Sequence, residues 1–187
     1  MQDYTEFIDE ILVSETSLQQ RVAELGEQIS HDYAGEELLV VCVLRGGIIF
    51  AADLIRQISV PHELDCMALS SYGVGNYESS GNVRVHLDLE VNIEGRNVLL
   101  VEDIVDSGRT LAQVLEMLQT RGPKSLKVCV LLDKKERREV HVACDYVGFD
   151  VPDKYIFGYG IDIDEHFRQL PFIGCADMSK YRKPEQL

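Results

Sequence analysis

The chain has 187 residues, of which 45% are hydrophobic and 27% charged, and this length and composition suit one globular domain with a core of its own. Its formal net charge of −14 argues against nucleic-acid binding, which depends on neutralising phosphates with Lys and Arg. No apolar run reaches the length of a membrane helix, and the acidic first residues do not form a secretory signal. We therefore expect a cytoplasmic protein that binds neither nucleic acid nor membrane.

The five cysteines fit the same compartment. Their number is odd, none forms a Cys-x-x-Cys pair, and most lie in apolar, strand-like runs. These features predict buried free thiols in a reducing environment rather than disulfides or a zinc site.

In chain order, the first predicted element is a helix over residues 17–33, where apolar side chains recur at helical spacing. Ser14 or Thr16 can cap its start. A near-continuous apolar run at 37–44 predicts a strand that is buried on both faces. After an Arg-Gly-Gly break, a second helix is expected over 48–58.

The rest of the chain alternates between strands and helices. We expect strands over 62–69, 83–89, 97–103 and 125–133, a helix over 110–120, and short strands near Tyr146 and at 155–159 that finish the sheet. This alternation predicts an α/β fold with a mainly parallel, twisted sheet flanked by helices. Such sheets bind ligands at the carboxyl ends of their strands.

The most informative stretch, residues 98–110, contains a buried strand, two acids, a short turn and the start of a helix. The turn would direct several backbone N–H groups at one point, which makes an anion site. Gly108 permits close approach of the backbone, and Ser107 and Thr110 add hydroxyl donors. Glu102 and Asp103 should point to opposite sides of the strand end and offer carboxylates to ribose hydroxyls or hydrated Mg²⁺. The loop lacks the P-loop pattern, and its short span suits a single phosphomonoester.

This stretch resembles the phosphoribosyl-pyrophosphate-binding signature of type I phosphoribosyltransferases, and it looks most like the hypoxanthine-guanine branch. The resemblance extends over nearly the whole chain, from Leu44 to Arg168. It implies transfer of a 5-phosphoribosyl group from phosphoribosyl pyrophosphate to hypoxanthine, and also to guanine, with Mg²⁺ as cofactor. The products would be IMP or GMP and pyrophosphate.

The resemblance also implies how the chain is organised. It predicts one domain over residues 1–187, with a core over residues 35–150. A small hood subdomain would come from the N-terminal segment and residues 151–187. Members of the family are usually dimers or tetramers, so we expect a homodimer or homotetramer.

By the same resemblance, one group of residues binds the sugar phosphate. The 5′-phosphate would be held through the amides and hydroxyls of Asp106, Ser107, Gly108, Arg109 and Thr110. Glu102 and Asp103 would hold the ribose hydroxyls, directly or through Mg²⁺. Asp106 is also the candidate general base near purine N7, because a carboxylate there can take a proton as N9 becomes bonded to carbon.

A second group matches the pyrophosphate site of the family. Arg45 and Gly46 follow a buried strand, and Arg168 adds a second cation. A lysine is common where Arg45 stands, and the arginine keeps the charge. The family often has a cis peptide bond at Leu44-Arg45. Asp162 would bind the Mg²⁺ that carries pyrophosphate.

A third group matches the purine site and its cover. Lys134 would donate to the exocyclic 6-oxygen of the base, which favours a 6-oxopurine. Tyr155 would stack on the purine, and the backbone of Ile156 would hydrogen-bond its edge. Ser71 and Tyr72 match the Ser-Tyr pair of a mobile lid that shields the reaction from water.

Two alternatives remain open. A relative of the same fold can act as a non-catalytic regulator that binds RNA, but such a protein would need a basic surface and this chain is acidic. The enzyme could also prefer xanthine or guanine. Adenine and orotate transferases rank lower, because they lack the combination of Lys134 and Tyr155.

Overall fold

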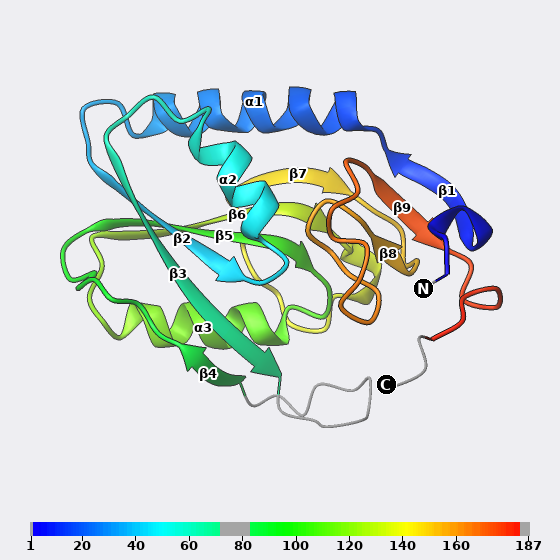
Figure 1. Cartoon of the computed structure of the whole chain (residues 1–187). Coiled ribbons are helices and arrows are strands. Elements are labelled where there is room, and N and C mark those ends of the chain that lie inside the picture. Colours follow the sequence, from blue (N-terminus) through cyan, green and yellow to red (C-terminus); the bar gives the residue numbers. More distant parts are fainter. Residues whose placement is uncertain (1, 72–82, 184–187) are drawn as a thin grey trace.

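The structure, a computed structural model, describes residues 2–71 and 83–183, which form two β-sheets and three α-helices (Figure 1). The large sheet has the strand order β4-β3-β2-β5-β6-β7. Its strands are β2 (Leu38–Leu44), β3 (His62–Ser71), β4 (Val83–Leu87), β5 (Asn97–Val105), β6 (Ser125–Asp133) and β7 (Tyr146–Asp150).

Neighbouring strands of the large sheet run parallel, except that β4 pairs antiparallel with β3. Leu38 at the start of β2 lies opposite both His62 of β3 and Asn97 of β5. These three parallel strands therefore start at the same level, and their carboxyl ends lie at the same edge of the sheet. The predicted mainly parallel α/β sheet is confirmed. The prediction that a strand near 155–159 finishes this sheet is wrong, because β8 (Ile156–Phe157) belongs to the small sheet.

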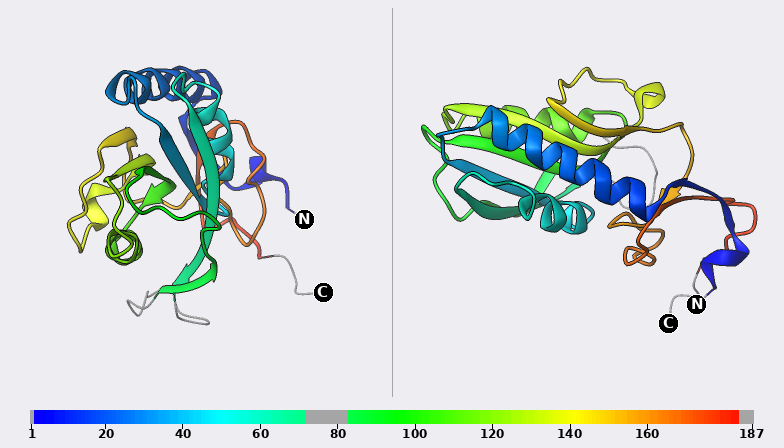
Figure 2. Two further views of the ribbon diagram at one scale, coloured as in Figure 1. Left: turned by 90° about the vertical axis from the view of Figure 1, so that its left-hand side faces the viewer. Right: turned by 90° about the horizontal axis from the view of Figure 1, so that it is seen from above.

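Helices cover both faces of the large sheet (Figures 1 and 2). α1 (Glu15–Asp32) and α2 (Ile48–Ile55) lie on one face, and α3 (Arg109–Gln119) lies on the other. Successive side chains of a strand point to opposite faces, so β2 alternates between the two cores. Leu38, Val40 and Cys42 pack with α1 and α2, whereas Leu39, Val41 and Val43 pack with α3.

The ends of the first two helices have simple local causes. Ser14 is the N-cap of α1, and its side chain accepts a hydrogen bond from the Ser17 N–H at 3.2 Å. This confirms one of the two predicted caps. α2 ends at Ile55 rather than at residue 58, because the Gln57 N–H bonds the Leu54 carbonyl and turns the chain out of the helix.

The small sheet joins the two ends of the chain. Its order is β1 (Ile8–Val13), β9 (Ile173–Ala176) and β8, all antiparallel. Phe7 lies at the centre of an aromatic cluster, with ring centroids 5.5 Å from Phe157 and 5.3 Å from Phe167. Residues far apart in the sequence therefore form a second, separate core beside the edge of the large sheet where β2 and β5 end (Figure 1).

The five cysteines are free thiols, as predicted, and burial raises the pKa of each above that of an ordinary thiol. Of the helices in the described part of the chain, none has the length and apolar character needed to cross a membrane.

Candidate active site

The loops that follow β2, β5 and β6 meet at the carboxyl edge of the large sheet. A fourth segment, residues 158–168, joins them from the side of the small sheet. Its backbone packs closely against the loop after β2, where a side chain on Gly160 would collide with the Gly46 carbonyl. Gly160 also has a φ of +101°, which favours glycine. Polar side chains from all four segments are thus collected in one place.

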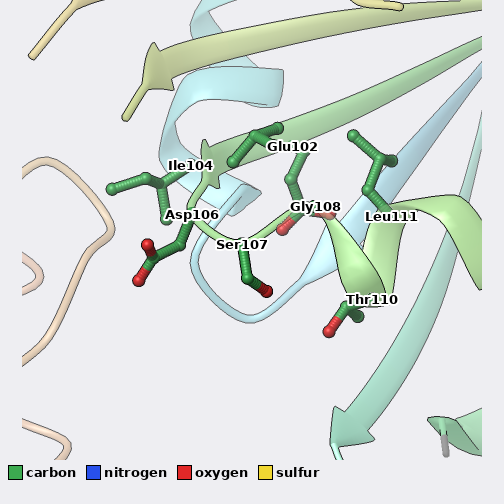
Figure 3. Close-up of a pocket in the computed structure, with 8 residues that line it drawn as sticks. Glu102, Ile104, Asp106, Ser107, Gly108, Thr110 and Leu111 are labelled. Carbon is green, nitrogen blue, oxygen red and sulfur yellow. The ribbon is translucent and has the colours of Figure 1, made fainter. Parts of the chain in front are cut away.

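A small cavity of about 180 Å³ opens where β5 passes into α3 (Figure 3). It is lined by Glu102, Ile104, Val105, Asp106, Ser107, Gly108, Thr110 and Leu111. The first N–H groups of α3 have no partners within the helix and carry the positive end of its dipole. This cavity therefore has the size and polarity to hold one phosphate group.

The turn at this cavity is fixed from behind by the loop after β6. Gly108 is the N-cap of α3 with a φ of +82°, and a side chain there would lie 2.5 Å from the Val140 carbonyl. The Glu139 and Val140 N–H groups both donate to the Ser107 carbonyl, at 2.9 and 3.0 Å. Asp106 is therefore not the N-cap of α3. Its carboxylate remains available to the site.

The two acids at the end of β5 are held in an environment that disfavours their charge. Glu102 lines the small cavity, whereas Asp103 lines a larger one, as expected from alternation along a strand. Burial raises the pKa of Glu102 well above its usual range, and the negative charge of Asp103 adds to the effect. Burial also raises the pKa of Asp103. A cation or a set of hydrogen-bond donors would relieve this cost.

The larger cavity, of about 530 Å³, lies on the other side of the acids. It is lined by Leu44, Arg45, Gly46, Ala68, Leu69, His86, Asp103, Asp162 and Arg168. The peptide bond between Leu44 and Arg45 is cis. Gly46 leaves room for Asp103, because a side chain on Gly46 would collide with the Asp103 carboxylate as it lies in the structure. The structure thus brings together the residues that were expected to bind pyrophosphate.

The arginines of the larger cavity are already bound to carboxylates. Arg168 donates to Asp162 at 2.8 Å, to Glu165 at 2.9 Å and to the Gly160 carbonyl at 2.7 Å. Arg45 donates to the same Glu165 carboxylate at 2.7 Å. Glu165 was not singled out in the sequence. The signal for it in the sequence is its spacing of three residues from Arg168, with which it forms an ion pair.

The expected purine-binding residues lie around the start of β8. Lys134 is buried, with 7% exposure, and its Nζ donates to the Lys154 carbonyl at 2.8 Å. Lys134 thus points inward, although it lies in a run of charged residues. Tyr155 is 38% exposed, and Ile156 is buried and pairs with Cys175 of β9.

Further residues that the sequence did not indicate surround this group. Arg137 lies 3.6 Å from the carboxylates of both Asp106 and Asp153, and so links the phosphate turn to the β8 segment. Arg138 forms a buried ion pair with Asp133 behind the site. These charges lie in a run that looks solvated in the sequence, and no pattern in it separates buried from exposed positions.

Two predicted groups stand apart. The Arg109 side chain binds Glu139 at 2.6 Å, and Arg109 does not line the small cavity, unlike the other four residues expected to hold the 5′-phosphate. Tyr72 of the predicted lid lies outside the described residues. Ser71 ends β3, and the structure describes its backbone alone.

Mg²⁺ fits the chemistry of the acids, since it prefers carboxylate oxygens. In the described part of the chain, no group of three or more His, Cys, Asp and Glu side chains could enclose a metal ion. Glu102, Asp103 and Asp162 therefore do not form one protein cage. This arrangement suits Mg²⁺, which usually keeps several waters and takes only one or two carboxylates together with substrate phosphates. The two acids at the end of β5 are a place where its charge would be stabilising, since desolvation raises the pKa of both carboxyl groups.

Comparison with known proteins agrees with this geometry. A family model described as a phosphoribosyl transferase domain matches residues 10–166. A hypoxanthine phosphoribosyltransferase of Salmonella typhimurium is 48% identical over 167 residues, which cover 88% of this chain and 93% of the relative. A hypoxanthine-guanine phosphoribosyltransferase of Mycobacterium avium is 46% identical over 182 residues, covering 94% and 89%.

A solved structure of a hypoxanthine phosphoribosyltransferase from Staphylococcus aureus superposes with a TM-score of 0.90 at 40% identity, covering 94% of this chain and 95% of that one. The chain belongs to the phosphoribosyltransferase family. Within that family, it is similar to the hypoxanthine and hypoxanthine-guanine enzymes.

Proposed function

We propose that the protein transfers the 5-phosphoribosyl group from phosphoribosyl pyrophosphate to hypoxanthine, and to guanine as a second base, in purine salvage. One observation carries the proposal. A phosphate-sized cavity and a larger cavity with two arginines flank a single pair of acids at the end of β5. Phosphoribosyl pyrophosphate has the same order of groups, with a phosphate at one end, pyrophosphate at the other and ribose hydroxyls between them.

In this proposal, the turn from Asp106 to Thr110 binds the 5′-phosphate through its amides and hydroxyls. Glu102 and Asp103 accept hydrogen bonds from the ribose hydroxyls. Arg45 and Arg168 bind the pyrophosphate. The substrate would span the acid pair, which fixes the C1′ carbon near the junction of the two cavities. Most of the rate acceleration would come from this orientation and from stabilisation of the departing charge.

The base would lie between Tyr155 and the end of β6. Stacking on Tyr155 accepts any purine. Lys134 supplies the selectivity, because its ammonium donates and does not accept, so that it favours a 6-oxo over a 6-amino group. The Lys154 carbonyl holds the ammonium in place at 2.8 Å. The backbone of Ile156 would bind the edge of the base.

Asp106 is the proposed general base. Its carboxylate is held between the phosphate turn and Arg137, at 3.6 Å from the guanidinium. Positioned beside purine N7, it would take the proton that the base must lose as N9 bonds to C1′. Mg²⁺ held at Asp162 would neutralise charge on the pyrophosphate, and Mg²⁺ held at Glu102 and Asp103 would bind the ribose hydroxyls.

A steady-state assay with four bases tests the proposal. Purified protein with phosphoribosyl pyrophosphate and Mg²⁺ should show its highest kcat/KM with hypoxanthine, a lower value with guanine and none with adenine. Addition of EDTA should abolish the reaction. Efficient use of adenine, or the absence of nucleotide formation with every base, would refute it. A preference for xanthine would retain the reaction but correct the base.

We also propose that the protein is a cytosolic homodimer or homotetramer. Its free thiols are suited to a reducing compartment. Light scattering coupled to gel filtration measures the assembly directly, and a monomer at micromolar concentration would contradict it.

A further inference from the structure

The carboxylate of Glu165 occupies an unusual position for a reaction that binds an anion. One of its oxygens accepts from Arg45 at 2.7 Å, and the other accepts from Arg168 at 2.9 Å. These are the two arginines of the larger cavity. A single carboxylate therefore bridges both cations through separate oxygens, much as one phosphate group of a ligand would.

The cluster has no positive charge left over. Arg168 is also bound to Asp162 at 2.8 Å, so two guanidinium groups face two carboxylates. An incoming anion meets a neutral cluster and must compete for the same N–H donors. An arginine has five such donors in a fixed plane, and the internal carboxylates use several of them.

The two carboxylates differ in their freedom to move. The Asp162 side chain is 30% exposed, and its second oxygen accepts from the Glu165 N–H at 2.8 Å, which ties it to the loop backbone. The Glu165 side chain is 55% exposed. Rotation into solvent is therefore open to the Glu165 side chain.

We propose that Glu165 is an internal competitor of pyrophosphate, which limits how tightly Arg45 and Arg168 hold the product. This inference rests on the proposed function, since it requires pyrophosphate to bind these arginines. The role is useful for turnover, because a product held by two uncompensated arginines would leave slowly, and product release often limits kcat.

The test is calorimetric binding of inorganic pyrophosphate, in the presence of Mg²⁺, to the wild type and to Glu165→Gln. Exposed ion pairs are individually weak. We therefore expect a modest effect, with the dissociation constant lowered by about two- to tenfold in the variant. Glu165→Gly should behave in the same way, and it suits the positive φ at this position.

Glu63→Gln is the matched control. Glu63 is also an exposed acid paired with an arginine, Arg96 at 3.0 Å, but it lies near the start of β3, at the opposite end of the sheet. This variant removes the same charge and should leave pyrophosphate binding unchanged. A similar tightening in Glu63→Gln would show that net charge is responsible, and would overturn the inference.

The remaining outcomes separate the inference from the proposed function. If the wild type binds pyrophosphate and both Glu165 variants bind it equally or more weakly, the inference alone is overturned. Weaker binding by the variants would mean that Glu165 positions the two arginines. Absence of pyrophosphate binding to the wild type would refute the pyrophosphate site itself, and the inference with it. A lower kcat in Glu165→Gln, together with tighter pyrophosphate binding, would support the link to product release.

Discussion

Replacement of Gly160 by alanine should damage both stability and pyrophosphate binding. Gly160 has a φ of +101°, and a side chain there would collide with the Gly46 carbonyl. A left-handed backbone costs an alanine about 1–2 kcal/mol. Forcing two packed backbones apart adds about 1–3 kcal/mol. The variant should therefore lose about 2–5 kcal/mol of unfolding free energy.

Gly35→Ala isolates the backbone term. Gly35 has a φ of +81°, but nothing lies within 4 Å of a side chain at that position. This variant should lose only about 1–2 kcal/mol. The effect of alanine on the unfolded chain is common to both variants and cancels in their difference. The difference of about 1–3 kcal/mol then measures the collision with Gly46.

Urea unfolding gives both free energies, and thermal melting should show a difference of roughly 2–12 °C between the variants, since 1 kcal/mol shifts Tm by about 2–4 °C in a chain of this size. The KM for phosphoribosyl pyrophosphate should rise in Gly160→Ala alone, because the displaced loop carries Arg45. Equal stability of the two variants, or an unchanged KM in Gly160→Ala, would refute the reasoning.

Three further variants test the site. Asp106→Asn should lower kcat by about 100- to 10,000-fold, which is the usual contribution of a general base. Its affinity for phosphoribosyl pyrophosphate should stay within a few-fold of the wild type. Turnover at the wild-type rate would show that Asp106 is not the general base. Lys134→Met removes a charged donor worth about 1.5–3 kcal/mol, so kcat/KM with hypoxanthine should fall by about 10- to 150-fold. The control is Lys135→Met, at the exposed neighbour that binds Asp150, and its kcat/KM should match the wild type. A large loss in both would indicate a structural effect. Glu102→Gln tests the raised pKa of Glu102. The Glu102 carboxyl group binds a proton more tightly in the folded than in the unfolded state. The unfolding free energy of the wild type should therefore decrease as pH rises above about 4–5. In EDTA, the variant should therefore be more stable than the wild type at pH 8 and similar at low pH, and a less stable variant at pH 8 would contradict the cost assigned to this charge.

The central part of the fold was predictable because its signals are local. β5 is a nearly continuous apolar run, and a parallel strand covered by helices on both faces requires such a run. α3 carries Leu111, Val114 and Leu118 at helical spacing, and all three are buried. The turn between them combines acids, a glycine and hydroxyls in a short span. Each of these features is fixed by residues within a few positions of one another.

The small sheet has no comparable signal. β1 pairs with β9 from the far end of the chain, with Ile8 opposite Ala176, and only Val13 of the six residues of β1 is buried. β8 has two residues. Strand preference depends on packing with partners more than on the sequence of one strand. The partners of β1 and β8 are distant in sequence, so their pairing could not be deduced from either segment alone.

The charged residues of the site were predictable in type but not in arrangement. The run from Asp133 to Glu139 contains only charged side chains. In the structure, Lys134 turns inward, Arg138 pairs with Asp133, and Arg137 reaches Asp106. The run contains a 3₁₀ turn over 135–137 and is held by groups outside it, since Lys135 binds Asp150 of β7 and the Glu139 N–H donates to the Ser107 carbonyl of the phosphate turn. The same holds for Glu165, which reaches Arg45 across 120 positions of sequence.

The pairing of β1 with β9 also sets an order of events during synthesis. Each strand of the large sheet through β7 leaves the ribosome before β9, so that sheet has all its partners while the nascent chain is still incomplete. β1 precedes every strand of the large sheet in the chain, yet its partner β9 follows all of them. β1 therefore lacks its partner strand until the large sheet is complete, and β8, which carries the expected purine-binding Ile156, also gains its partner β9 only then.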